Sequence, residues 1–214
     1  MLGLLSPEDV YEAFRRFLAA RLRPVDEDAV HVSEVCRCLR ASFFSRMYGS
    51  RDLTHLTPAK RVVLGLGLST HLVLEEVLRG MGYVTERQVA AEVDGFRLVG
   101  TPDAVGRDHV VEIKTVSSVP ERPYPHHVLQ LNAYLGMLGC GTGYLVYISK
   151  KDGLVKVLPH PYRDFLFRDL QSRAAKLYSH LRSGEVPQAE PTPLCNYCEW
   201  RWRCVGGGEV GSGY

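Results

Sequence analysis

Apolar residues recur at every third or fourth position in five stretches of the chain, which is the spacing of a helix with one buried face. Two of these stretches begin with good helix starts, at Ser6-Pro7 and at Thr57-Pro58. The pattern predicts helices at residues 6–22, 34–47, 57–80, 125–138 and 162–182.

The period changes to two after Gly82, which is typical of strands with one buried face. Asp94-Gly95 has the composition of a tight hairpin turn. The predicted strands are residues 83–93, 96–100, 109–116, 143–149 and 154–158. Since a helix separates the third strand from the fourth, we expect a strand-helix-strand crossover. The expected fold class is α/β, with a mixed central sheet flanked by helices.

Composition excludes several classes of protein. Of the 214 residues, 45% are hydrophobic and 23% are charged, values that rule out collagen-like, disordered and disulfide-scaffold chains. The longest apolar runs, residues 62–68 and 144–148, are far shorter than the roughly 18 residues of a membrane span. With no recognisable signal peptide at the start, we expect an intracellular, cytoplasmic protein with no membrane partner. The net charge of +2 means that any nucleic-acid surface must be local.

Three of the six cysteines lie within ten residues, as Cys195-x2-Cys198-x5-Cys204, which suggests metal or cluster ligation. A four-thiolate site needs one more ligand, which Cys36 or Cys38 can supply. If these two lie on one helix, they point about 200° apart, so only one of them faces the C-terminal loop. Zinc ribbons usually have two close cysteine pairs, whereas iron-sulfur clusters tolerate uneven spacing better.

The segment from Thr101-Pro102-Asp103 to Glu112-x-Lys114 carries the candidate chemistry. On a strand, Glu112 and Lys114 share one face, and a hairpin brings Asp103 beside Glu112. Two carboxylates about 4 Å apart repel by roughly 4 kcal/mol at an effective dielectric near 20, so a positive group must hold them together. Lys114 alone can do so in a structural ion pair. The alternative is Mg²⁺ or Mn²⁺, which hard oxygen ligands suit.

These residues resemble the motifs of the RecB-like branch of the PD-(D/E)xK nucleases, over residues 33–204. The matching residues are, in chain order, His71, Asp103, Glu112, Lys114, Gln130 and Tyr134. One cysteine far upstream and three at the C-terminus resemble the iron-sulfur site of the CRISPR-associated members of that branch. The order, the spacing and the cysteine set together make the resemblance specific.

The resemblance implies a role for each motif residue. The implied ligands of a Mn or Mg ion are His71, Asp103, Glu112 and the carbonyl of Ile113. Lys114 would assist the attacking water.

Gln130 and Tyr134, at i and i+4 on one helical face, would line the active site and face the DNA. The implied cluster ligands are Cys36, Cys195, Cys198 and Cys204. The resemblance favours 4Fe-4S, although four thiolates also serve 2Fe-2S.

The expected organisation has four parts. They are an N-terminal helical region with the first cluster cysteine (1–56), a RecB-like nuclease core (57–184), an iron-sulfur loop (185–205) and a flexible tail (206–214). The N- and C-terminal segments together would form the iron-sulfur subdomain.

The function implied by the resemblance is a metal-dependent single-stranded DNA exonuclease, 5′ to 3′, that processes spacer precursors in CRISPR adaptation. Its implied partners are single-stranded DNA or DNA with single-stranded ends, and CRISPR integrase proteins. Two alternatives remain open. One is a non-catalytic DNA-binding or adaptor protein with a structural metal or iron-sulfur site, and the other is a zinc-bound DNA-end binder.

Overall fold

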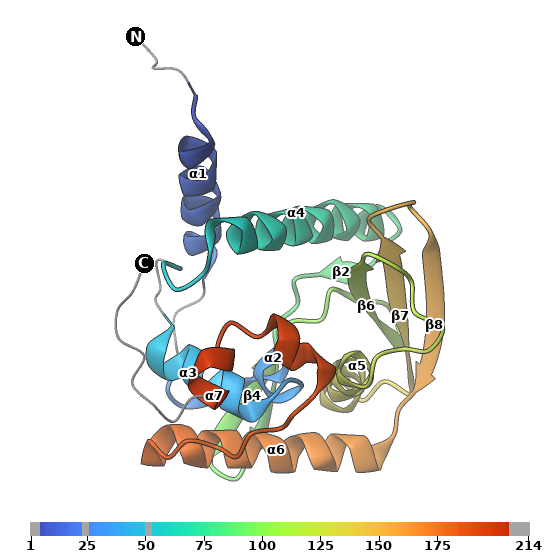
Figure 1. Cartoon of the computed structure of the whole chain (residues 1–214). Helices are drawn as coiled ribbons and strands as arrows, with labels where there is room; N and C mark the ends of the chain where they lie inside the picture. Colours follow the sequence, from blue (N-terminus) through green and yellow to red (C-terminus); the bar gives the residue numbers. More distant parts are fainter. Residues whose placement is uncertain (1–4, 23–25, 50–52, 206–214) are drawn as a thin grey trace.

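The computed structural model describes residues 5–22, 26–49 and 53–205, and these contain two mixed β-sheets; the strands β6, β7 and β8 of the larger sheet lie on the right of Figure 1. The expected tail at 206–214 lies outside these residues. The five-stranded sheet has the order β2-β5-β6-β7-β8, and the three-stranded sheet has the order β1-β4-β3. The strands are β1 (Ala29–His31), β2 (Val84–Thr85), β3 (Val89–Val93), β4 (Phe96–Gly100), β5 (Ala104–Val105), β6 (His109–Val116), β7 (Thr142–Ser149) and β8 (Val155–Pro161).

Helices cover both faces of the five-stranded sheet. The helical elements are α1 (Pro7–Ala19), α2 (Val32–Val35), α3 (Leu39–Tyr48), α4 (Pro58–Gly80), α5 (Pro125–Leu138), α6 (Asp164–Ser183), the 3-10 helix η1 (Pro193–Tyr197) and α7 (Arg201–Val205). Helix α5 packs on the sheet face that carries Val110 and Leu145, in the main core. Helix α4 contributes Leu74 and Leu78 to a smaller core on the opposite face, with Val111 and Ile113. The α/β class with helix-flanked mixed sheets is therefore confirmed.

Several local predictions are confirmed. Ser6 caps α1 in a reciprocal capping box with Asp9. Strands β3 and β4 form an antiparallel hairpin whose turn residues, Asp94 and Gly95, both have positive φ. Strands β6 and β7 run parallel across the α5 crossover. Gly184 ends α6 in the left-handed conformation.

The expected single strand at 83–93 is wrong. The chain divides there into β2, which pairs with β5, and β3, which pairs with β4 in the other sheet. Glu86 has a φ of 56° between the two strands. This left-handed residue turns the chain from one sheet to the other, and the alternating pattern does not reveal it.

The expected continuous helix at 34–47 is also wrong. Helix α2 ends at Val35, and α3 begins at Leu39, with Cys36 and Cys38 at the two flanking cap positions. The guanidinium of Arg173 binds the turn between them, because it donates to the carbonyls of Val35 at 3.1 Å and of Arg37 at 2.9 Å. A tertiary contact from α6 thus overrides the local helical pattern.

The N-terminal and C-terminal segments lie against each other, with α7 beside α3 (Figure 1). The indole nitrogen of Trp200 donates to the hydroxyl of Ser45 at 2.8 Å, and its ring lies 6.1 Å from that of Phe44. Strand β1 also pairs in parallel with β4, so the N-terminal region contributes to the central sheets as well as to helices. The two segments of the expected subdomain therefore meet, while the cluster stays a prediction.

Within the described ranges, no helix is both long enough and apolar enough to cross a membrane.

Candidate active site and cysteine pocket

Asp103 lies between β4 and β5, where the hairpin pairing of β5 with β6 places it next to Glu112. One carboxylate oxygen of Asp103 accepts a hydrogen bond from the backbone N–H of Ile113 at 2.6 Å. The other lies 3.2 Å from Nδ1 of His71, which reaches down from α4. The site therefore draws on the link between the two sheets, on β6 of the five-stranded sheet and on α4.

Glu112 and Lys114 share one face of β6, and that face is covered by α5. Nζ of Lys114 donates to Oε1 of Glu112 at 2.8 Å and to Oε1 of Gln130 at 2.9 Å. The amide of Gln130 in turn donates to the hydroxyl of Tyr134 at 3.4 Å. A strand and the helix packed on it thus bring four of the predicted site residues together.

Glu112 is buried and only partly hydrogen-bonded, so its environment indicates what the site can bind. Its side chain is 3% exposed, and its Oε2 has no hydrogen-bond partner among the residues that the structure describes. Burial and the charge of Asp103 raise the pKa of Glu112, against the opposing effect of Lys114. A buried carboxylate oxygen without a partner is costly, and a divalent cation would compensate for it. The donor set of Glu112 and Asp103 therefore fits a hard metal ion.

Lys114 remains charged although it is buried. Burial alone would lower the pKa of its ammonium, but the carboxylates of Glu112 and Asp103 outweigh that effect and raise it. The hydrogen bond to Asp103 likewise raises the pKa of His71. The site thus holds a fixed positive charge at neutral pH.

Glu75 is a further acidic residue near the site that the sequence analysis did not single out. It lies one helical turn after His71 on α4, and burial together with the negative charge of Asp103 raises its pKa. The i, i+4 spacing from His71 is the signal that could have identified it.

Three of the predicted metal ligands have side chains in two hydrogen-bonded pairs: His71 with Asp103, and Glu112 with Lys114, which is not itself a predicted ligand. Across the part of the chain that is described, no three His, Cys, Asp or Glu side chains are already arranged to hold an ion. Closing the two pairs around a cation would require side-chain adjustment.

A second feature is a cavity of about 600 Å³ between the N-terminal turn and the C-terminal loop. Four of the residues that line it are cysteines: Cys38, Cys195, Cys198 and Cys204. All are free thiols. The backbone N–H of Thr192 donates to Sγ of Cys195 at 3.4 Å, a contact that suits a thiolate. The cavity thus gathers four of the six cysteines, the donor type of an iron-sulfur cluster, although these side chains are not already arranged to hold an ion.

Cys36, the residue that the family resemblance implied as the fourth cluster ligand, lies elsewhere. It does not line the cavity, and burial raises the pKa of its thiol to about 12. The charges that act on this thiol include Lys114 and Glu112, so Cys36 is on the side of the candidate active site. The structure thus groups Cys38 with the three C-terminal cysteines.

An ion pair holds the turn between α2 and α3 (residues 36–38) against the connector, the segment that joins α6 to η1 (residues 184–192). Besides the two carbonyls of the turn, Arg173 binds Glu190 through two hydrogen bonds of 2.8 and 3.1 Å. Glu190 also accepts a hydrogen bond from the backbone N–H of Leu39, at the start of α3. Helix α6, the turn at Cys38 and the connector are therefore tied to one another.

The model of the PD-(D/E)XK nuclease superfamily matches residues 12–205, so the chain belongs to this superfamily. It is 30% identical over 134 residues to the CRISPR-associated exonuclease Cas4 of Saccharolobus solfataricus, a match over 58% of this chain and 65% of that protein, just under two thirds. The crystal structure of SSO0001 superimposes with a TM-score of 0.68 and 23% sequence identity, over 96% of this chain and 98% of that one. The structural match supports the fold.

Proposed function

We propose that this chain is a metal-dependent DNA nuclease. The observation that carries the proposal is the buried carboxylate oxygen of Glu112, which has no partner among the described residues and lies between Asp103 and the charged Lys114. Membership of a nuclease superfamily supports it.

The ligands proposed for a Mn or Mg ion are His71, Asp103, Glu112 and the carbonyl of Ile113. When bound, such an ion neutralises the phosphodiester charge and lowers the pKa of an attacking water. The ammonium of Lys114 supplies a further positive charge, which would stabilise the negative charge that develops on the phosphate in the transition state.

Gln130 holds Lys114 in place through their hydrogen bond, and Gln130 is itself hydrogen-bonded to Tyr134. Lys114 is the side chain proposed to contact the phosphate, and Gln130 would act through Lys114, so Gln130 is proposed as a positioning residue.

The proposed substrate is single-stranded DNA or a single-stranded DNA end, cleaved exonucleolytically from 5′ to 3′. The proposed biological role is trimming of spacer precursors in CRISPR adaptation, with integrase proteins as partners. Similarity to a CRISPR-associated exonuclease supports this role.

We assign the cysteine cavity to an iron-sulfur cluster held by Cys38, Cys195, Cys198 and Cys204, of the 4Fe-4S type by resemblance. This assignment replaces Cys36 with Cys38 because of the placement described above. The proposed role of the cluster is structural, since hydrolysis of a phosphodiester involves no redox step.

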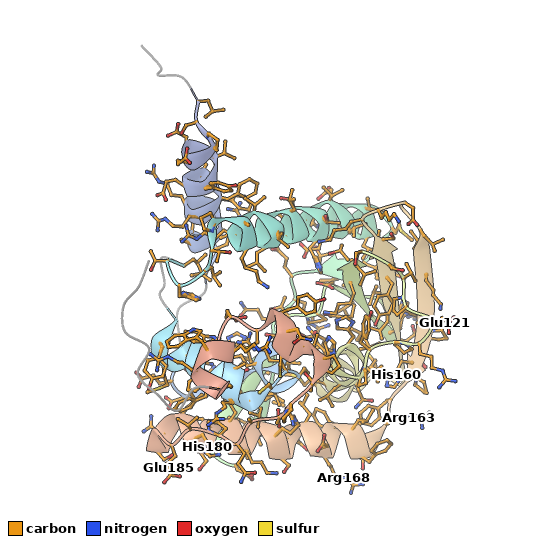
Figure 2. All side chains as sticks on the ribbon, viewed as in Figure 1. Glu121, His160, Arg163, Arg168, His180 and Glu185 are labelled. Carbon is orange, nitrogen blue, oxygen red and sulfur yellow. The ribbon has the colours of Figure 1, made fainter. Side chains whose placement is uncertain are left out.

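Cleavage of end-labelled single-stranded DNA with Mn²⁺, by wild type and Glu112→Gln, tests the nuclease proposal. We expect a loss of cleavage of at least 100-fold in Glu112→Gln, because the amide removes a charged metal ligand. Glu185→Gln is the matched control: Glu185 is exposed just beyond the end of α6 and should leave cleavage unchanged (Figure 2).

The order in which the two end labels are released gives the polarity. If a folded wild-type protein does not cleave, the nuclease proposal fails and the adaptor alternative gains support. If Glu112→Gln cleaves as well as wild type, the assignment of the active site to Glu112 fails.

A further inference from the structure

Four aromatic rings gather at the start of α5, outside the set of residues implied by the nuclease motifs. Tyr124 stacks on His126, with ring centroids 5.8 Å apart and an interplanar angle of 21°. Tyr124 also makes edge contacts with His127 at 5.5 Å and with Tyr147 at 6.2 Å. The exposed member of the group is Tyr124, with 42% of its surface accessible.

The rings are held by hydrogen bonds as well as by packing. The buried hydroxyl of Tyr147 accepts a hydrogen bond from the backbone N–H of Tyr124 at 3.1 Å and lies 2.9 Å from Nδ1 of His127. Lys156 on β8 donates to two carbonyl groups of the loop before α5, at 3.0 and 2.8 Å. The loop that presents Tyr124 is therefore anchored in its middle, at Pro120 and Glu121, and at its end, at Tyr124.

The stacked pair lies next to the candidate active site. His126, Gln130 and Tyr134 are spaced at i, i+4 and i+8, so they follow one face of α5. Gln130 is the residue that binds Lys114. Exposure increases toward the start of α5: Tyr134 is only 2% exposed, His126 is half-buried, and Tyr124, the residue before the helix, is exposed at the surface. The stacked pair thus lies between the buried site and solvent.

The chemistry of the pair suits a nucleic-acid base better than a phosphate. Burial, with a smaller contribution from the charge of Lys114, lowers the pKa of His126, so its ring is neutral at pH 7. A neutral, anchored aromatic surface gives stacking without base-specific hydrogen bonds. A positive charge lies close by: Lys114 on β6 acts on His126 and is hydrogen-bonded to Gln130, one helical turn further along α5.

From this geometry we propose that Tyr124 and His126 form a stacking platform for a base of single-stranded DNA, next to the phosphate that is cleaved. A base that is paired and stacked inside a duplex has no free face for a side chain, so the platform requires an unstacked base, and this requirement favours a single strand. The inference rests on the proposed nuclease function and adds a substrate contact to it.

The test uses single-stranded DNA carrying the fluorescent base 2-aminopurine at each of several positions from the end, with Glu112→Gln as the non-cleaving background. We expect quenching at one position, where the base stacks on Tyr124. Tyr124→Ala should remove that quenching and weaken binding about 10-fold, within the range measured for loss of one base-aromatic stack. The backbone N–H that binds Tyr147 remains in this variant, so the loop keeps its anchor.

Tyr124→Phe and Tyr124→Trp should restore both quenching and affinity, because both keep an aromatic face. Phe165→Ala, which removes an exposed aromatic ring from α6, should change neither. Binding within twofold of wild type, with quenching intact in Tyr124→Ala, would overturn the platform.

The cleavage assay separates the two proposals. Cleavage by wild type with no effect of Tyr124→Ala on binding refutes the platform and leaves the nuclease. Loss of quenching in Tyr124→Ala, in a protein that does not cleave, supports the platform and refutes the nuclease. A wild-type protein that binds no single-stranded DNA refutes the platform.

Discussion

At the scale of single residues, Gly100 shows how closely the core approaches the active site. A Cβ at this position would lie 2.6 Å from a ring carbon of Tyr134 and 3.2 Å from a methyl group of Val32. Tyr134 is buried, so its ring has little room to move away. The absence of a side chain at Gly100 therefore lets β4 pass the helix that carries Gln130.

We expect Gly100→Ala to lower the free energy of unfolding by about 1–3 kcal/mol, because the added methyl group overpacks the contact with Tyr134. Urea denaturation measures the change. Gly80→Ala is the control: a Cβ there meets nothing within 4 Å, and alanine is a better helix former at the end of α4. Equal stability of wild type and Gly100→Ala would contradict the packing argument.

The sequence was informative about the residues on regular strands and less so about the turns. Strand alternation placed Glu112 and Lys114 on one face, and the hairpin brought Asp103 next to them, as the structure shows. The position of Cys38 depends on a turn that Arg173 holds from 135 positions further along the chain. No local pattern encodes such a contact.

At the scale of elements, a buried ion pair joins β1, α2 and α3. Arg46 binds both carboxylate oxygens of Glu34, at 2.6 and 2.9 Å, and also donates to the carbonyl of Ala29 at 2.8 Å. The side chains of the pair are only 10% and 16% exposed. Removing one partner would leave a buried charge without compensation.

We expect Arg46→Ala to destabilise the protein by about 3–5 kcal/mol. Arg16→Ala breaks an exposed pair with Glu12 and should cost no more than about 1 kcal/mol. Chemical denaturation of both variants at pH 7 tests the difference. Similar losses of unfolding free energy in Arg46→Ala and Arg16→Ala would show that burial does not make the Arg46–Glu34 pair more important than an exposed pair.

The same pair predicts a pH dependence. The hydrogen bonds and charge of Arg46 outweigh the effect of burial and hold the pKa of Glu34 below its ordinary value near 4.5. The stabilisation is therefore present above pH 4.5 and is lost as pH falls through the lowered pKa. The difference in unfolding free energy between wild type and Arg46→Ala should narrow in acid. A difference that stays constant from pH 7 to pH 3 would contradict this coupling.

Helices and strands with clear caps or turns could be predicted from sequence, while the breaks within them could not. Pro58 after Thr57 and Gly184 after α6 are local signals, and both elements begin or end where these residues indicate. The break at Glu86 arises because residues on its two sides pair with different sheets, β2 with β5 and β3 with β4. Such pairing is a tertiary effect.

At the scale of the whole molecule, the cysteine cavity joins chain segments about 160 residues apart. A cluster across them would close most of the chain into one loop and restrict the unfolded state. By the entropy of loop closure, this cross-link is worth about 5 kcal/mol.

Cys38→Ala should therefore lose both bound iron and broad visible absorption, and should unfold at lower denaturant concentration. Cys36→Ala is the matched control two residues away, and it should keep its iron because this thiol lies outside the cavity. Iron analysis and absorption spectra of anaerobically purified proteins provide the readout. Loss of iron in Cys36→Ala alone would restore the original assignment, and zinc in place of iron would favour the zinc-bound alternative.

Asp103 occupies the short link between two sheets, since β4 belongs to the three-stranded sheet and β5 to the five-stranded one. Its carboxylate is hydrogen-bonded to β6, and α4, which carries His71, packs on the same five-stranded sheet. Asp103 and His71 are therefore both attached to that sheet. The link at residues 101–103 can bend between the two sheets without separating these two predicted metal ligands.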